Sequence, residues 1–357
     1  MNTESIPTLQ ENKNIKAYNT FGVDCMAEYY ARVDHLEQLQ NVLGQLSISY
    51  NRMLILGGGS NLLFVGNYGG IVLHNAFKGI EVLDEDAGRI RIQVGAGMNW
   101  HRFVTYCVER EWGGIENLAL IPGRVGAAPI QNIGAYGVEF EDVFESLRAV
   151  HLKSGEVEAF DNEECRFGYR DSIFKGALKG QYLITDITLI LEKNKAPDTS
   201  YDSLSNHLMD QGIHEPGIED VFRAVVDIRQ SKLPDPDELG NAGSFFKNPV
   251  ITSGRYESLE KEFGEVPGYP EGNNKIKVPA AWLIDKAGWR GVRRGEVGTY
   301  PHQALVIVNY GGATGAQILE FAAEIRSAVF ERFEIKLDPE VNIITTGDQD
   351  WKRLLIN

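Results

Sequence analysis

The sequence predicts an α+β protein with more than one domain, and three observations lead to that prediction. Up to about residue 195, short apolar runs alternate with glycine-rich turns and a few helical segments, which favours α+β over a regular βαβ repeat. Ile90, Ile92 and Val94 alternate with polar residues, the pattern of a half-buried strand. At 357 residues, the chain is long enough for two or three domains, each with its own core.

The other elements follow from apolar periodicity and from residues that begin or end helices. Asn99 is expected to cap a helix that runs to Trp112, and Thr314 to cap a helix with one apolar face. Pro234 and Pro236 break a helix and mark the predicted domain boundary. The remaining expected segments are a strand at 52–56, a strand at 182–191, a loop at 193–206, a helix at 218–230, a helix at 278–288, a buried strand at 304–309 and a closing strand at 335–345.

Composition and charge argue against several classes of function. The net charge of −15 and the pI near 5.0 argue against nucleic-acid binding, which needs a basic face. Residues 1–15 are polar and no apolar run reaches the roughly 18 residues of a membrane span, so we expect neither a secretory signal nor a membrane segment. Cys25, Cys107 and Cys165 show no metal or CxxC spacing. We interpret them as free thiols in a reducing cytoplasm, and we expect no metal site.

The first glycine-rich segment is a candidate phosphate site. Gly57, Gly58 and Gly59 follow an apolar run, and Ser60 and Asn61 come next. Three glycines free the backbone N–H groups to point inward, and the two polar side chains add donors, a combination that suits a diphosphate. A glycine-rich hairpin turn is the alternative interpretation.

The second glycine-rich segment spans residues 121–137. It begins with Ile121, Pro122, Gly123 and Gly126, whose small side chains allow a flat ring or a cofactor backbone to lie against the main chain. Gln131 offers hydrogen bonds to a heterocycle. Two such segments in one region favour a single long dinucleotide, and close packing of strands is the alternative.

A third segment, residues 240–249, places Ser244 after Gly243 and before two phenylalanines, with Asn248 near its end. It is too apolar for an ordinary surface loop. We interpret it as a serine held rigidly beside polar groups that can bind an anion, with a tightly packed turn as the alternative.

Three charged residues are further candidates. Arg170 lies between Tyr169 and Asp171, where its guanidinium can bind a carboxylate with two hydrogen bonds or form a structural ion pair with the aspartate. Glu340 lies in an apolar stretch, where a buried carboxylate is costly unless it is paired or functional. Lys232 lies beside two prolines, as a rigidly presented cation or as a solvated loop lysine.

Seven motifs in the same order give the chain a resemblance to the UDP-N-acetylenolpyruvoylglucosamine reductase family. The resemblance runs from about Tyr18 to Val341. The motifs are LILGGGSNLL, IPGRVGAAPIQNIGAYG, CRFGYRDSIFK, KLPDP, GNAGSFFKNP, AAWLID and LDPEV. One of them alone would be a weak signal, but seven in order are specific.

The resemblance implies an α+β protein with a vanillyl-alcohol-oxidase/PCMH-type FAD-binding fold of two subdomains and a separate α+β substrate-binding domain. The implied division places the first FAD subdomain at 1–75, with a strand from 335–357 returning to it. The second FAD subdomain is placed at 76–230 and the substrate domain at 231–334. The implied cofactors are non-covalent FAD and NADPH as the hydride donor. A cytoplasmic enzyme with a small-molecule substrate and no obligate protein partner is expected.

Carried over motif by motif, the resemblance implies a role for each candidate. Ser244 is the proton donor, and Arg170 and Glu340 stabilise an enolate formed when the enolpyruvyl ether is reduced. The implied FAD contacts are Gly57, Gly58, Gly59, Ser60, Asn61, Ile121, Pro122, Gly123, Gly126 and Gln131. The implied substrate contacts are Tyr169, Tyr201, Lys232, Asn248 and Gln303, with Tyr201 on the loop that marks one subclass.

Two positions depart from the family pattern: Tyr300-Pro301-His302 near Gln303, and Asp338 where glutamate is more common. Another FAD-dependent oxidoreductase of the same fold, acting on an alcohol or a lactone, is the alternative enzyme. A non-enzymatic nucleotide-binding protein is the third possibility, but it predicts loss of Ser244, Arg170 or Glu340, and the chain has all three.

Overall fold

The structure is a computed structural model that describes residues 9–45 and 52–345. Its contacts divide the chain into two units, each built from separate segments. The first unit comprises Met1–Lys13, Ala27–Gly58 and Gly70–Arg229, and the second comprises Asn14–Met26, Gly59–Gly69 and Gln230–Asn357. The division falls within helix α5 (Ile218–Lys232), and the three-part division expected from the sequence stays a prediction.

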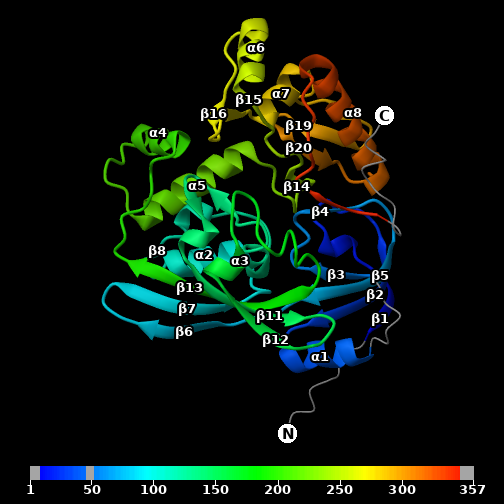
Figure 1. Cartoon of the computed structure of the whole chain (residues 1–357), viewed down its shortest axis with the longest axis vertical. Coiled ribbons are helices and arrows are strands. Elements are labelled where there is room, and N and C mark those ends of the chain that lie inside the picture. The colour runs from blue at the N-terminus through cyan, green and yellow to red at the C-terminus, as the bar shows by residue number, and fades with distance from the viewer. Residues whose placement is uncertain (1–8, 46–51, 346–357) are drawn as a thin grey trace. The chain divides into compact units, whose positions relative to one another are not determined.

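The first unit contains a small mixed sheet in the order β1-β2-β5-β3 (Figure 1). The parallel strands β3 and β5 pair Leu56 with His74, so both strands end at the same edge of the sheet. Helix α1 buries Leu39 and Val42 against this sheet. The bounds are β1 Gln10–Asn14, β2 Met26–Val33, α1 Leu36–Gln45, β3 Met53–Leu56 and β5 Tyr68–Asn75.

A larger antiparallel sheet forms the rest of the first unit, in the order β12-β11-β13-β7-β6, with β8 added to β13 (Figure 1). Helices α2 and α5 bury their apolar faces in one core with this sheet. The main elements are β6 Ile80–Glu85, β7 Arg89–Gly95, α2 Trp100–Val108, β8 Trp112–Gly113, β11 Phe144–His151, β12 Val157–Asp161, α3 Asn162–Cys165, β13 Tyr182–Lys193 and α4 Asp202–Asp210. The short β9 Gly134–Ala135 and β10 Val138–Glu139 form a separate hairpin.

The second unit packs helices α7 and α8 with an antiparallel sheet in the order β14-β20-β19-β18. A three-stranded sheet, β15-β17-β16, lies beside α6, and β21 pairs in parallel with β4. The bounds are β4 Leu62–Phe64, β14 Gly240–Ser244, β15 Val250–Thr252, α6 Ser253–Phe263, β16 Tyr269–Pro270, β17 Lys275–Lys277, α7 Ala280–Lys286, β18 Arg293–Arg294, β19 Val297–Tyr300, β20 Gln303–Asn309, α8 Gly315–Phe333 and β21 Asn342–Ile344.

The helix caps expected from the sequence are confirmed. The side chain of Asn99 accepts from the N–H of Arg102, and Thr314 forms a capping box with Gln317. The expected loop at 193–206 is wrong in its second half, because α4 begins at Asp202. The closing strand is shorter than expected, and residues 346–357 lie outside the described residues.

The three cysteines are buried and free, as expected. Among the described helices, none combines the length and the apolar character needed to cross a membrane. Residues 9–45 and 52–345 contain no group of three or more His, Cys, Asp or Glu side chains arranged to hold a metal ion.

Candidate active site

The two glycine-rich segments of the first unit lie against each other where β3 and β5 end. A Cβ on Gly58 would lie 3.1 Å from the Cα of Gly123, and a Cβ on Gly57 would lie 3.4 Å from the Cγ of Arg124. A Cβ on Gly126 would lie 2.6 Å from that of Ala96. A methyl group at these positions would therefore clash or crowd its neighbour, which explains the glycines on packing grounds. The absence of side chains also leaves backbone uncovered at the carboxyl edge of a parallel strand pair, where α/β proteins bind ligands.

Two arginines bring uncompensated positive charge to this edge. Among the described residues, neither Arg124 nor Arg102 has a side-chain ion pair or hydrogen bond. Burial and the nearby Arg102 both lower the pKa of Arg124. Burial, followed by the charges of Arg124 and Arg32, lowers the pKa of His74 to about 4, so His74 is neutral near pH 7. The site therefore favours an anion.

The remainder of the first glycine segment belongs to the second unit. A Cβ on Gly59 would lie 2.0 Å from the carbonyl oxygen of Tyr18, so this glycine is required for packing. The carbonyl of Asn61 accepts from the N–H of Asn342 (3.0 Å), and the Nδ2 of Asn61 donates to the carbonyl of Glu340 (3.4 Å). The predicted diphosphate loop is thus divided between the units after Gly58.

The candidate Arg170 lies in a tight turn of the first unit with left-handed backbone (φ +55). Its Nη2 donates to the carbonyl of Gly134 (2.6 Å), and its guanidinium lies 5.3 Å from the centre of the Tyr169 ring. The alternative of an ion pair with Asp171 is not observed among the described residues. Asp171 instead accepts from the N–H of Ser172 (3.0 Å).

Arg229 is a site residue that the sequence analysis missed. Its Nε is buried and has no hydrogen-bond partner among the described residues. Burial lowers the pKa of its guanidinium, Tyr136 acts in the opposite direction, and the charge of Arg170 lowers it further. An orphaned buried donor beside a second arginine can donate to an acceptor of a ligand, which makes Arg229 a candidate site residue. Local sequence carried no signal for it, because α5 reads as an ordinary amphipathic helix.

The loop that carries Tyr201 is attached to the same region of the first unit. Tyr201 precedes α4, is about half exposed, and lies edge-on to Tyr136 with ring centres 5.5 Å apart. The Nδ2 of Asn117 donates to the carbonyls of both Tyr136 and Asp198 (2.8 Å each), which anchors the loop. The structure therefore places Tyr201 and Arg170 on neighbouring segments of one unit.

In the second unit, backbone pairing joins the two residues that follow Ser244 to Pro339 and Glu340. Ser244 ends β14 after the left-handed Gly243 (φ +68), and Phe245 and Phe246 behind it are fully buried. The N–H of Glu340 donates to the carbonyl of Phe245 (2.8 Å). The expectation of a buried carboxylate at Glu340 is wrong in degree, since this residue is only half-buried.

The expected substrate contacts of the second unit are spread over three elements. The Oδ1 of Asn248 accepts from the N–H of Ala280 (2.9 Å), so this side chain already supports the start of α7. Gln303 begins β20, and Lys232 is an exposed residue at the end of α5. Ile121 and Gln131 of the first unit are half-buried and Pro122 is exposed.

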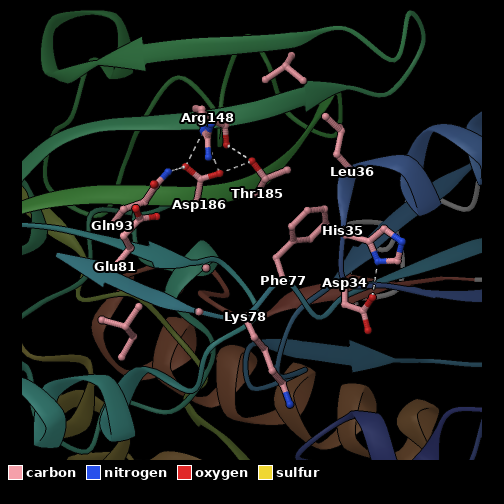
Figure 2. A pocket seen from close by; sticks show the side chains of 14 residues that line it. Asp34, His35, Leu36, Phe77, Lys78, Glu81, Gln93, Arg148, Thr185 and Asp186 are labelled. Atoms are coloured by element: carbon pink, nitrogen blue, oxygen red, sulfur yellow. Dashed lines mark hydrogen bonds and ion pairs between the residues drawn. The ribbon is translucent and has the colours of Figure 1, made fainter. Parts of the chain in front are cut away.

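The first unit also contains a pocket of about 450 Å³ that none of the predicted site residues lines (Figure 2). On its sheet side, Asp186 is bound by the facing Arg148 (2.8 Å), by Gln93 and by the hydroxyl of Thr185 (2.8 Å). Arg148 and Asp186 are register partners on β11 and β13, so this ion pair fastens two strands. The carboxylate is already satisfied, and we assign the cluster a structural role.

Comparison with known proteins agrees with this architecture. A family model described as an FAD binding domain matches residues 27–161, and one for the C-terminal domain of UDP-N-acetylenolpyruvoylglucosamine reductase matches residues 235–344. The crystal structure of that reductase from Thermus caldophilus has a TM-score of 0.65 at 24% identity, and the alignment covers 95% of this chain and 99% of that one. Fold and cofactor domain define an FAD-dependent oxidoreductase with a separate C-terminal domain.

Curated relatives identify the family. A UDP-N-acetylenolpyruvoylglucosamine reductase of Amoebophilus asiaticus is 49% identical over 336 residues, which cover 94% of this chain and 99% of the relative. That of Pseudomonas aeruginosa is 44% identical over 338 residues, with 94% and 98% covered. The chain belongs to the UDP-N-acetylenolpyruvoylglucosamine reductase family, and its cofactor is FAD.

Proposed function

We propose that this chain is the NADPH-dependent reductase that converts the enolpyruvyl ether of UDP-N-acetylglucosamine to UDP-N-acetylmuramate, a step in peptidoglycan precursor synthesis. The near full-length similarity to relatives of that name carries the proposal. The hydrogen bond from the N–H of Glu340 to the carbonyl of Phe245, the residue after Ser244, supports it, because this reaction needs a proton donor at a fixed position. The substrate is a soluble sugar nucleotide, in line with a cytoplasmic enzyme.

The residues of the first unit fit an FAD diphosphate. Gly57, Gly58 and Gly123 leave bare backbone, and Arg124 and Arg102 supply charge that has no ion pair within the described chain. The orphaned Nε of Arg229 fits an acceptor of the cofactor or the substrate. Ile121, Pro122, Gly126 and Gln131 of the second glycine segment, and Gly59, Ser60 and Asn61 of the second unit, are proposed as further contacts. FAD held by these residues would supply the hydride chemistry that links NADPH to C3 of the enolpyruvyl group.

The chain's own groups then manage charge and the proton. Hydride addition at C3 leaves negative charge at C2 that is delocalised into the substrate carboxylate. The guanidinium of Arg170 stabilises that charge, because it is fixed by the Gly134 carbonyl and needs no rearrangement. Ser244 holds a proton at its Oγ for delivery to C2, and Glu340 is proposed to stabilise the enolate together with Arg170.

Substrate binding is assigned to the polar side chains around these groups. Lys232 and Tyr201 contact the diphosphate, one as a cation without an ion pair in the described residues and the other from an anchored loop. Tyr169, Asn248 and Gln303 are proposed as further contacts. The Oδ1 of Asn248 already accepts from the N–H of Ala280 at the start of α7, so we propose that the Nδ2 of this side chain is the atom that donates to the substrate.

A test of the proposed function follows the flavin by absorbance. The purified protein should be yellow and release FAD when it is denatured. NADPH should bleach it under anaerobic conditions, and the enolpyruvyl sugar nucleotide should restore the colour while gaining two hydrogens by mass. Restoration by oxygen but not by this substrate would overturn the assignment in favour of an oxidase.

A further inference from the structure

The direction of the Arg170 side chain is set by the backbone of residues 132–134. Its Nη2 donates to the carbonyl of Gly134 (2.6 Å), and its Nη1 lies 3.5 Å from that of Asn132. The turn that carries Arg170 is itself closed by two backbone hydrogen bonds between Gly168 and Asp171 (3.2 and 3.0 Å). Whatever fixes residues 132–134 therefore also fixes the guanidinium.

The side chain of Asn132 connects this segment to two glutamates. Asn132 is fully buried and has left-handed backbone (φ +43). Its Nδ2 donates to Glu139 Oε2 and to Glu141 Oε1, both at 2.8 Å, and its Oδ1 accepts from the N–H of Glu141 (3.0 Å). The same Nδ2 lies 3.4 Å from the carbonyl of Gly168 in the Arg170 turn. One buried amide thus links both carboxylates to the segments that hold the arginine.

Gly134 brings one of these glutamates next to the guanidinium. A Cβ at this position would lie 3.0 Å from the Nη1 of Arg170 and 3.0 Å from the Cγ of Glu139. No side chain fits between them. The charge of Glu139 therefore acts on Arg170 at short range.

Two ionised carboxylates on one amide nitrogen repel each other, and the repulsion is relieved when they share one proton. The pKa of Glu139 is raised, first by burial, then by its hydrogen bond with Glu141 and by the charge of that group. Arg170 acts in the opposite direction, and Asp142 adds to the rise.

We propose that Glu139 and Glu141, held 2.8 Å from one amide nitrogen, share one proton and are the positioning pair for Arg170. With Asn132, the pair fixes the carbonyls that aim the guanidinium, and the shared proton limits the negative charge beside it to one. This inference rests on the proposed function, in which Arg170 binds an anionic substrate. Loss of the shared proton as the pH rises adds a second negative charge and weakens that binding.

The test is Glu141→Gln, which keeps the hydrogen bonds and removes the titration. The amide oxygen accepts from Asn132, and the amide N–H₂ donates to the Glu139 carboxylate. In the unsubstituted enzyme, the KM for the enolpyruvyl substrate should rise about tenfold as the pH is raised and the pair loses its proton, the factor that corresponds to an interaction of one pKa unit. In Glu141→Gln this rise should be absent. Asp142→Asn makes an equal charge change on the same turn without contact to Asn132, and it removes only one of the charges that raise the pKa of Glu139. It should therefore keep the rise in KM but move it to lower pH.

Thermal unfolding provides a readout that is independent of activity. A carboxyl whose pKa is raised by folding contributes stability below its unfolded pKa, and that contribution is lost as the pH rises through its folded pKa. The Tm of Glu141→Gln minus that of the unsubstituted protein should therefore increase as the pH rises. An unchanged alkaline rise in KM together with a constant Tm difference would overturn the inference. Failure of the proposed function would appear in the unsubstituted protein, as a flavin that the enolpyruvyl substrate does not reoxidise, and the Tm comparison would still test the pair.

Discussion

The Arg170 region and the Ser244 region present their polar groups by different means. Around Arg170, the non-glycine residues Leu120, Asn132, Tyr136 and Arg170 have left-handed backbone, with φ between 43 and 56°. Beside Ser244, the left-handed residue is a glycine, Gly243, which lies where the pairing of β14 with β20 shifts register. Left-handed backbone costs a non-glycine residue stability and persists where surrounding contacts enforce it. A guanidinium aimed by several carbonyls needs such backbone, whereas a single hydroxyl needs only a strand end.

The largest expected effect concerns Ser244. Ser244→Ala removes the proton donor but keeps the shape of a strand end that Phe245 and Phe246 already fix by burial. Reoxidation of the flavin by the enolpyruvyl substrate should slow by about 10²–10⁴, the usual worth of general acid catalysis. Reduction by NADPH should be nearly unchanged, because it needs no proton at C2. Stopped-flow absorbance measures both half-reactions.

Ser244→Cys separates the chemical role from a structural one. A thiol can also donate a proton, so cysteine should recover part of the rate that alanine loses. Equal slowing of both half-reactions, with no difference between cysteine and alanine, would show that Ser244 only supports the loop.

The second effect concerns the arginine of the irregular region. Arg170→Lys keeps the positive charge but loses the forked geometry that binds Gly134 and substrate together. The kcat/KM should fall by about 10²–10³, as when one donor to a developing oxyanion is removed. Arg166→Lys is the matched control, since Arg166 is also left-handed (φ +48) but exposed. An equal fall in kcat/KM in both variants would show that the effect comes from any arginine-to-lysine change at a left-handed position, and not from the guanidinium of Arg170.

In both units, regular helices and strands were easier to predict from sequence than the irregular turns. Caps at Asn99 and Thr314 and the alternation at 90–94 are local signals, and the structure confirms all three. The start of α4 at Asp202 was missed because the helix is short and follows a polar, proline-containing stretch. Its register is fixed by tertiary burial of Leu204 and Leu208.

Some site residues could be identified from the sequence and others could not. The glycine segments and the Ser244 loop were identified because their composition is unusual. Arg102, Arg124 and Arg229 were not, because an arginine without an ion pair looks the same in sequence as one with a partner. Only the fold shows that Arg229 has a buried Nε without a partner, and that Asn248 already caps α7.

A smaller effect is expected at Lys232, the exposed end of α5. Lys232→Ala should weaken binding of the sugar nucleotide by about 1–3 kcal/mol, the worth of a hydrogen bond to a charged group. Titration of the oxidised flavin spectrum measures this affinity. Lys261→Ala, a lysine in the last turn of α6 in the same unit, should leave it unchanged. Equal affinities in both variants would remove Lys232 from the diphosphate site.

The smallest effect is expected at Arg124. This residue lies at the glycine segments of the first unit, and its own backbone is not left-handed, so its substitution tests side-chain charge separately from backbone conformation. Arg124→Gln keeps a side chain of similar length on Gly57 but removes a charge that has no ion pair within the described residues. The dissociation constant for FAD should rise about tenfold, for loss of one charged hydrogen bond. Fluorescence of released FAD measures it. Because the interaction is partly exposed, the difference should shrink as salt is added.

Arg110→Gln is the matched control for Arg124. Arg110 is in the same unit, but its guanidinium stacks on the ring of Tyr106 at 3.5 Å, away from the glycine segments. It should retain FAD like the unsubstituted protein at every salt concentration. If Arg124→Gln also retained FAD like the unsubstituted protein, the charge of Arg124 would have no role in FAD binding, and its side chain would only pack against Gly57. The bare backbone of Gly57, Gly58 and Gly123 would then have to bind the diphosphate without help from a side chain, by backbone N–H groups, as in other glycine-lined anion sites.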